Sequence, residues 1–228
     1  MICANLDNIR QSIALAAGKA GRNPDEIQLL AVSKRVDAAT VKKAWQCGQS
    51  LFGENFVQEA QSKIELLDPS ITWHFIGHLQ SNKAKLAARL FGLIETVDRL
   101  KLARSLNRHA AELSKTLDIL IQVNVGEERQ KSGVLPQNAE QLIREIGELE
   151  HLRIRGLMTM PPFTDNPELS RPHFRSLKKI ADEFSVKGYF SNDAPFILSM
   201  GMSGDYPVAI EEGATLVRVG TAIFGKRA

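Results

Sequence analysis

Apolar residues follow two different spacings along this chain. From residue 4 to about residue 19 they recur every three or four positions, with Leu6, Ile9 and Ile13 on one side, which is typical of an amphipathic helix. Elsewhere they form short runs that carry little or no charge, as at residues 27–34, and such runs are typical of buried strands. The runs that we expect to be strands cover residues 27–34, 51–53, 73–77, 93–97, 118–125, 152–160, 197–202 and 215–220.

Helical spacing returns between each pair of consecutive runs. Pro136 is expected to begin one of these helices, because proline favours the first helical turn, and Ser170 is expected to precede another. Ser81 and Asp98 are expected to cap two more helices with their side-chain oxygens. Since parallel strands need a connection about as long as a helix, the regular alternation predicts a parallel sheet.

Eight strands with a helix between each pair predict an α/β fold, a single (β/α)8 TIM barrel with an extra N-terminal helix. An open doubly wound sheet is the alternative, and it should carry a glycine-rich turn after its first strand. That turn is Ser33-Lys34-Arg35-Val36-Asp37 and contains no glycine, which favours the barrel. No glycine-, serine- or proline-rich linker interrupts the chain, so we expect one domain over residues 1–228.

Composition argues against several classes of protein. The net charge of +3 over 228 residues is too small to indicate a surface that binds nucleic acid. No apolar stretch has the length of a membrane span, and Asp7 and Arg10 make the N-terminus unlike a signal peptide. Cys3 and Cys47 form neither a CxxC pair nor a metal-ligand spacing, and so few cysteines indicate a reducing compartment. We therefore expect a cytoplasmic protein.

Lys34 stands where the first expected strand ends, just before a helix. In parallel α/β folds this edge of the sheet is where ligands bind. An apolar wall beside a lysine disfavours its charged form, and the neutral amine is a nucleophile that forms a Schiff base with an aldehyde. A solvated lysine at a strand end is the alternative that this stretch alone leaves open.

Two loops at the same edge have the composition of an anion site. Ser203 and Gly204 follow the seventh expected strand directly before a helix, and Gly220 and Thr221 end the eighth. Backbone N–H groups at such positions bind anions, and barrels often hold a phosphate in the loops after these two strands. A tight turn with a serine cap would explain either loop alone. Together the two loops predict a site for a phosphate group.

Other polar residues accompany these loops. Arg218 lies inside an apolar strand, where we expect it either to pair with a core carboxylate or to donate to a ligand. Asn55 and Lys131 follow the second and fifth expected strands at the ligand-binding edge. His74 and His78 are four residues apart, but they fall across a strand end and no carboxylate accompanies them, so we expect no metal site.

Because the eighth strand of a barrel closes onto the first, Lys34 and the phosphate loops should be neighbours. An aldehyde that carries a phosphate would bridge them, and pyridoxal 5′-phosphate fits that description. Seven motifs accompany this arrangement: AVSK (31–34), FGENFVQE (52–59), WHFIG-x-LQSNK (73–83), KSG (131–133), RGLMTM (155–160), SMGMSGD (199–205) and VRVGTAIFG (217–225). In this order they resemble the pyridoxal phosphate homeostasis proteins, the YggS/PROSC family.

The resemblance implies a barrel of fold type III, similar to the N-terminal domain of alanine racemase. It also implies that Lys34 holds pyridoxal phosphate as an internal aldimine and that Arg218 faces the pyridine nitrogen. His78 departs from the family pattern, in which some relatives carry proline, and we assign it no role. The residues that match the family's cofactor site are Lys34, Asn55, Ser203, Gly204, Arg218, Gly220 and Thr221.

An arginine keeps its proton, so it leaves the pyridine nitrogen unprotonated and the ring a weaker electron sink. The resemblance implies that racemases of this fold add a second base, a tyrosine from a C-terminal domain across a dimer. We expect no such domain here. The tyrosines of this chain are Tyr189 and Tyr206, and Tyr206 beside the phosphate loop is a candidate lid residue.

We therefore expect a monomeric protein that binds pyridoxal phosphate, buffers it and delivers it, with little or no turnover. Apo-enzymes that use this cofactor are the expected transient partners, and Lys131 is a candidate secondary amine for loading or release. A low-activity, racemase-like enzyme acting on amino acids is the alternative. A Schiff-base aldolase acting on a sugar phosphate is a third hypothesis, because it would use the same phosphate loops.

Overall fold

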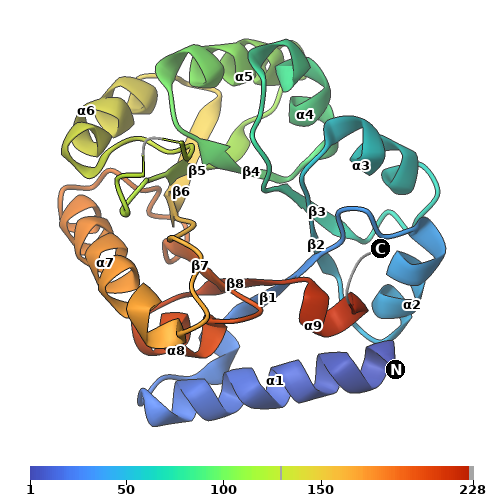
Figure 1. The fold of residues 1–228 in the computed structure, drawn as a ribbon. Helices are drawn as coiled ribbons and strands as arrows, with labels where there is room; N and C mark the ends of the chain where they lie inside the picture. The colour runs from blue at the N-terminus through green and yellow to red at the C-terminus, as the bar shows by residue number, and fades with distance from the viewer. Residues whose placement is uncertain (129, 226–228) are drawn as a thin grey trace.

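The computed structural model describes residues 1–128 and 130–225. Within these residues eight strands form one closed sheet, in which neighbouring strands run parallel and the last strand pairs with the first (Figure 1). The expected (β/α)8 barrel is therefore confirmed. The strands are β1 (Gln28–Val32), β2 (Leu51–Glu54), β3 (Thr72–Phe75), β4 (Leu93–Val97), β5 (Leu117–Gln122), β6 (Leu152–Met158), β7 (Ile197–Met202) and β8 (Leu216–Val219).

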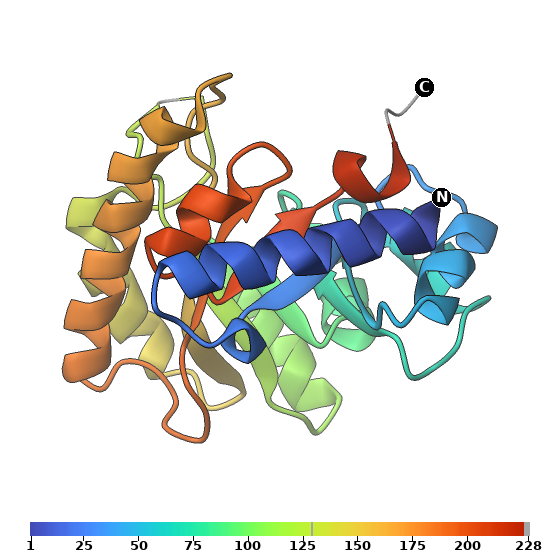
Figure 2. The same ribbon diagram turned by 90° about the horizontal axis from the view of Figure 1, so that it is seen from below.

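Helices surround the barrel, and the extra N-terminal helix α1 lies along its outside, next to α2, α8 and α9 (Figure 1). Figure 2 shows α1 extended across this side of the molecule. No helix among the described residues combines the length and apolarity that crossing a membrane requires. The helices are α1 (Ile2–Lys19), α2 (Ala38–Gln46), α3 (Val57–Ile64), α4 (Ala84–Leu90), α5 (Leu100–Glu112), α6 (Pro136–Gly147), α7 (Arg171–Val186), α8 (Tyr206–Glu211) and α9 (Thr221–Phe224), with 3-10 turns η1 (Pro24–Glu26), η2 (Ser81–Lys83) and η3 (Pro167–Ser170).

Two of the expected helix caps are wrong. Ser81 lies in η2, and α4 begins after Lys83 without a side-chain cap. Asp98 does not cap α5, because α5 begins after Arg99. The Asp98 carboxylate instead accepts hydrogen bonds from the Arg99 guanidinium at 2.5 Å and from the backbone N–H of Gly133 at 3.3 Å. These helices start one or more residues later than their polar flanking residues indicate.

The strands separate two apolar regions. Most buried apolar side chains lie between the strands and the helices, including Val217 and Val219 of β8. Inside the barrel are two small clusters, one with Leu30, Val32, Ile76 and Leu216 and the other with Leu93, Leu120 and Met158. Because successive strand residues point to opposite faces, Arg218 between the two valines points into the barrel.

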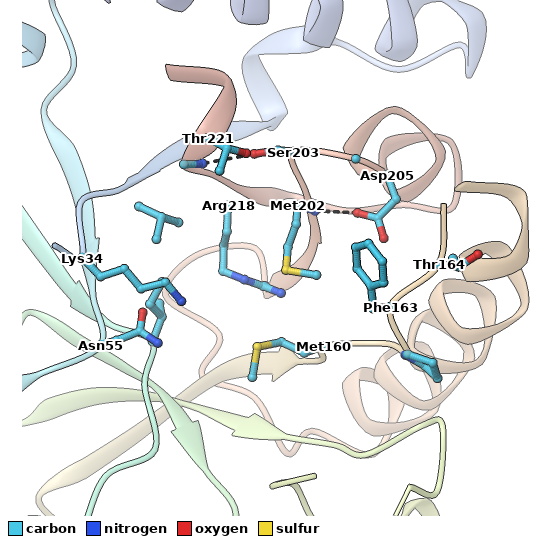
Figure 3. Close-up of a pocket in the computed structure, with 15 residues that line it drawn as sticks. Lys34, Asn55, Met160, Phe163, Thr164, Met202, Ser203, Asp205, Arg218 and Thr221 are labelled. Carbon is cyan, nitrogen blue, oxygen red and sulfur yellow. Dashed lines mark hydrogen bonds between the residues drawn. The ribbon is translucent and has the colours of Figure 1, made fainter. Parts of the chain in front are cut away.

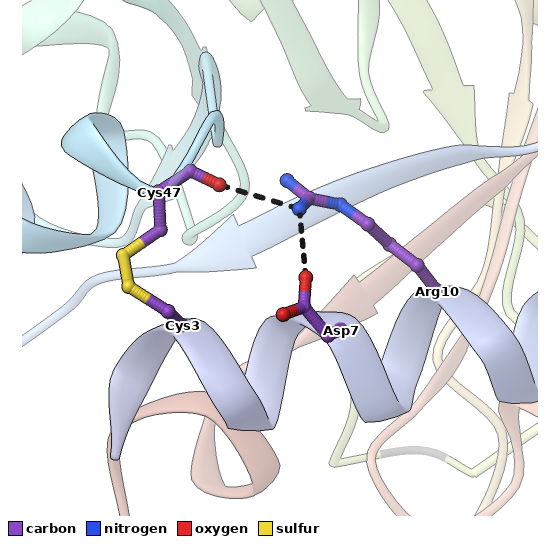
Figure 4. Close-up of a disulfide and its surroundings, with 4 residues drawn as sticks. All are labelled: Cys3, Asp7, Arg10 and Cys47. Carbon is purple, nitrogen blue, oxygen red and sulfur yellow. Dashed lines mark hydrogen bonds and ion pairs between the residues drawn. A yellow bond between two sulfur atoms is a disulfide. The ribbon is translucent and has the colours of Figure 1, made fainter.

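Cys3 and Cys47 form a disulfide, which the sequence analysis does not predict (Figure 4). The bond joins the first turn of α1 to the end of α2, with Cα atoms 5.3 Å apart. Beside it, the Arg10 guanidinium donates to the carbonyl oxygen of Cys47 at 3.3 Å and pairs with Asp7 at 3.6 Å. This pairing could not be read from the sequence, because 44 positions separate the two cysteines and their proximity depends on how α1 packs.

Candidate functional site

A cavity of about 310 Å³ opens at the C-terminal ends of the strands. It is lined by all seven residues that the sequence assigns to a cofactor site, namely Lys34, Asn55, Ser203, Gly204, Arg218, Gly220 and Thr221. Figure 3 shows the side chains of Lys34, Asn55 and Arg218 converging on one region of this cavity, with Ser203 and Thr221 close together at its edge. The pairing of β1 with β8 places the lysine beside the two loops.

Hydrogen bonds to residues of α3 and β2 hold the chain segment that carries Lys34. The ammonium of Lys63 donates to the carbonyl oxygen of Ser33 at 2.7 Å, and the backbone N–H of Arg35 donates to Glu59 at 2.5 Å. Bonds on both sides of Lys34 therefore hold its backbone, which restricts where its half-buried side chain begins.

Glu54 connects these groups in a fully buried position. Its carboxylate accepts hydrogen bonds from the Ser33 hydroxyl and from Lys63, both at 2.7 Å. Burial raises the pKa of the Glu54 carboxyl above its ordinary value, and the bonds from Lys63 and Ser33 partly oppose this change. The sequence motif FGENFVQE contains Glu54 and Glu59, but nothing in it shows that they face Lys63 and the backbone of Lys34.

Asn55 lies beside Lys34 in the cavity wall, directly after β2, which pairs with β1 (Figure 3). The backbone of Gly77 approaches it so closely that a Cβ at position 77 would clash with the Asn55 carbonyl oxygen. The side-chain Oδ1 of Asn55 is buried and has no hydrogen-bond partner among the described residues. A buried acceptor without a donor is costly, so a ligand that donates here would be favoured.

The two glycine-containing loops meet at one edge of the cavity. The backbone N–H of Gly220 donates to the Ser203 hydroxyl at 3.3 Å, and that of Met202 donates to the Asp205 carboxylate at 2.7 Å (Figure 3). Gly201 has a φ of +87°, and a Cβ there would clash with Ala209 and Tyr206, so this tight turn requires glycine. The structure thus brings together the two loops for which the sequence predicts a phosphate site.

Arg218 is almost fully buried at the inner end of the cavity. Its guanidinium donates to the Ser199 hydroxyl at 2.5 Å and to the Thr159 carbonyl oxygen at 2.7 Å. Burial lowers the pKa of the Arg218 guanidinium, while the charges of Glu95 and Asp205 raise it. Among the described residues Arg218 bonds to a hydroxyl and a carbonyl oxygen and not directly to a carboxylate, and it also lines the cavity, where a ligand could accept from it.

Sequence reasoning missed the outer wall of the cavity, which consists of Met160, Pro162, Phe163 and Thr164 in the loop after β6. The side chain of Phe163 is 86% exposed. Lys131 lies behind this loop, where its ammonium donates to the Pro161 carbonyl oxygen at 2.9 Å and pairs with Glu128 at 2.5 Å. Lys131 therefore contacts the wall without lining the cavity.

Two other expectations, on Tyr206 and His74, differ from the structure, and His78, to which no role was assigned, lies outside the cavity lining. Tyr206 is buried in the outer core and does not line the cavity, so its position does not support a lid role. His78 is exposed, with Nδ1 3.1 Å from the Ser132 hydroxyl, and it also lies outside the lining. The statement that no carboxylate accompanies His74 is wrong, because its Nδ1 lies 2.8 Å from Glu95. Within the described residues, His, Cys, Asp and Glu nowhere form a cluster of three or more suited to a metal ion.

Comparison with known proteins gives consistent matches over the length of the chain. Residues 4–228 match the family described as alanine racemase, N-terminal domain. The pyridoxal phosphate homeostasis protein of Aquifex aeolicus is 43% identical over 99% of this chain and 98% of its own. The structure of PipY from Synechococcus elongatus PCC7942 with PLP bound has a TM-score of 0.85 at 35% identity and covers 99% of this chain and 100% of PipY.

A more distant likeness shows the fold alone. An alanine racemase of Clostridium difficile 630 has a TM-score of 0.75 at 16% identity. The match covers 99% of this chain but 56% of the racemase, so the barrel corresponds to just over half of that protein.

Proposed function

The chain belongs to the family of pyridoxal phosphate homeostasis proteins, and from this premise we propose that it binds pyridoxal 5′-phosphate in the barrel cavity, buffers it and delivers it to other proteins. The observation that carries the proposal is the convergence of Lys34, Arg218 and the two glycine-containing loops on one cavity. Their chemistry matches three separate parts of that cofactor, namely its aldehyde, its ring nitrogen and its phosphate.

The residues present fit the cofactor. The orphaned Asn55 Oδ1 is an acceptor that an occupant could satisfy, and the cavity volume suits a molecule of this size. The cofactor supplies an aldehyde, which condenses with a primary amine and releases one water. Lys34 provides that amine, and the hydrogen bonds at Ser33 and Arg35 keep its backbone in place.

The other residues orient the ligand. We assign Ser203, Gly204, Gly220 and Thr221 to the phosphate, because hydroxyl and backbone N–H groups from two adjacent loops meet there. We assign Arg218 to the pyridine nitrogen, because it reaches the cavity from the inner side of the barrel while Ser199 and Thr159 hold its guanidinium. An arginine does not transfer its proton, so the ring nitrogen stays unprotonated.

The lining favours holding the cofactor over turning over an amino acid. Racemisation needs a proton donor and a proton acceptor on opposite faces of the reacting carbon. The ionisable side chains among the described lining residues are Lys34, Asp205 and Arg218. Asp205 accepts a hydrogen bond from the Met202 backbone within its own loop, and Arg218 keeps its proton, so this proposal assigns neither of these two side chains the role of a second base.

Delivery would use the cofactor's aldehyde carbon, at which an amine of the acceptor protein would replace Lys34 and Lys34 would leave as a free amine. We propose apo-enzymes of the same cofactor as transient acceptors, a monomer as the working form and the cytoplasm as its location. Lys131 is the proposed secondary amine for loading or release, and it lies against the wall loop at Pro161. Unchanged transfer rates to an apo-enzyme after Lys131→Ala would remove Lys131 from this scheme.

The proposal is tested by the absorbance spectrum of the purified protein with pyridoxal phosphate, before and after borohydride. We expect a yellow band that borohydride bleaches, absent in Lys34→Ala and present in Lys178→Ala, since Lys178 is a lysine on α7 that pairs with Asp182 and does not line the cavity. Wild-type protein without this band would contradict the proposal. An amino-acid racemisation assay on the same samples tests the racemase-like alternative, which requires turnover that Lys34→Ala abolishes.

A further inference from the structure

Four buried polar side chains form one hydrogen-bonded chain across the inside of the barrel. The Arg218 guanidinium donates to the Ser199 hydroxyl, and this hydroxyl donates to Glu95, both at 2.5 Å. The other oxygen of Glu95 lies 2.8 Å from His74 Nδ1. In the closed ring, β3 and β4 lie opposite β7 and β8, so the chain spans the barrel from His74 on β3 to Arg218 on β8.

The alternation of residues along the strands shows that these hydrogen-bonded side chains point into the barrel. Ile94 of β4 belongs to the outer core, as do Leu198 and Met200 of β7. Glu95 and Ser199 alternate with these residues, and so they point inward. Glu95 and Ser199 are fully buried, and His74 is 6% exposed, so water does not replace these hydrogen bonds.

The hydrogen-bonded side chains also balance the positive charge of Arg218. A buried guanidinium without a counter-charge is strongly unfavourable. The two carboxylates whose charges act on Arg218 are Glu95 and Asp205, and Asp205 is held at the loop by Met202. Glu95 is therefore the counter-charge inside the barrel, and Ser199 is the bridge between the two groups.

We propose that Glu95 is a positioning residue, which through Ser199 sets the orientation of Arg218 and balances the charge that it presents to the cavity. His74 holds the orientation of the Glu95 carboxylate through the oxygen that Ser199 does not contact. This inference rests on the proposed function in one respect, because its consequence is the electrostatic environment of a bound cofactor. Among the residues that the structure describes, the charged groups that line the cavity itself are Lys34, Arg218 and Asp205.

The first test measures the pH at which the yellow band of the loaded protein is half lost. The band belongs to the protonated Schiff base, whose positive charge is disfavoured when a nearby negative charge is removed. Glu95→Gln keeps the shape and removes the charge, so we expect the midpoint to fall by about one pH unit, a tenfold loss in proton affinity. Glu140→Gln is the matched control, since Glu140 is an exposed carboxylate on α6, and it should leave the midpoint unchanged.

Repeating the measurement in an Arg218→Gln protein shows whether Glu95 changes the midpoint through Arg218 or directly. If Glu95 acts through the arginine, Glu95→Gln should shift the midpoint far less when Arg218→Gln is already present. An equal shift in both backgrounds would overturn the positioning role. A folded Glu95→Gln protein with the midpoint of the wild type would overturn it as well.

A further measurement needs neither the cofactor nor a folded Glu95 variant. In nitrogen NMR spectra of the protein without pyridoxal phosphate, rotation of the Arg218 guanidinium should be slow, because two of its nitrogens are bonded. Ser199→Ala keeps both charges and removes the bridge, so rotation should become at least tenfold faster. Unchanged rotation in Ser199→Ala would refute the bridge, whereas a missing yellow band in the wild type would refute the proposed function alone.

Discussion

Glu54 shows how a single buried carboxyl beside the site should respond to pH. A carboxyl whose pKa is higher in the folded protein binds its proton more tightly there than in the unfolded chain. Its contribution to stability is therefore greatest below the unfolded pKa and is lost as the pH rises through the folded pKa. Since burial raises the pKa of Glu54, the ionised side chain should weaken the fold around Lys34 as the pH increases.

Glu54→Gln should remove this dependence while retaining an acceptor for Ser33. We expect its free energy of unfolding, relative to wild type, to rise between about pH 4 and about pH 8. Glu140→Gln should change in the opposite direction, because Lys187 and Tyr189 lower the pKa of Glu140. Urea unfolding of the three proteins at several pH values measures both trends, and parallel trends for the two variants would contradict the assignment.

The sequence predicts which residues line the cavity where their position depends only on their place at a strand end. Lys34, Ser203 and Thr221 follow their strands directly, and the closed barrel then brings them together. The contact between Glu95 and His74 cannot be predicted from the sequence, because it depends on which face of β3 and β4 points into the barrel. The wall residue Phe163 carried no signal at all, since it lies in an irregular loop.

At the scale of elements, the structure links α1 to the two segments that bound the site. The Cys3–Cys47 bond joins it to the end of α2, whose first residue lies four positions after Lys34, and Asn5 donates to the Ile223 carbonyl oxygen of α9 at 2.8 Å. Gly220 and Thr221 stand at the start of α9. α1 is therefore joined from outside the barrel to the helices that follow β1 and β8.

Reduction of this disulfide should destabilise the protein. A cross-link between residues 44 positions apart restricts the unfolded chain, and the loop-entropy relation gives about 4 kcal/mol for a loop of this length. Denaturant unfolding with and without a thiol reductant measures the effect, which we expect to approach that figure. The Cys3→Ser/Cys47→Ser variant should match the reduced protein and show no response to reductant.

If the midpoint of denaturant unfolding is unchanged after reduction, with both thiols shown to be free, other contacts keep α1 packed against the barrel. The bonds from Arg22 to the carbonyl oxygens of Ile210 and Ala214, at 2.9 and 2.8 Å, are the contacts to examine next. In a reducing compartment the two thiols would be free. The proposed cytoplasmic location therefore predicts that α1 is not cross-linked to α2, whereas the structure contains the cross-link.

At the scale of the whole molecule, closure of the barrel makes stability and ligand binding interdependent. The cavity is lined from β1, β2, β3, β6, β7 and β8 or the loops that follow them, so an unfolded chain cannot form it. A ligand that binds the folded state alone stabilises it by RT ln(1 + [L]/Kd). This relation gives about 2.7 kcal/mol when free ligand is a hundredfold above its dissociation constant.

We therefore expect the unfolding temperature of wild-type protein to rise steadily with pyridoxal phosphate concentration and to continue rising beyond saturation of the yellow band. Lys34→Ala should show a much smaller rise, because the phosphate loops and Arg218 remain but the covalent attachment is lost. Inorganic phosphate, which can occupy the loops without reaching Lys34, should give an equal small rise in both proteins. A large rise in Lys34→Ala would place most of the binding free energy in the loops and Arg218, and would make exchange at Lys34 a minor part of how the cofactor is held.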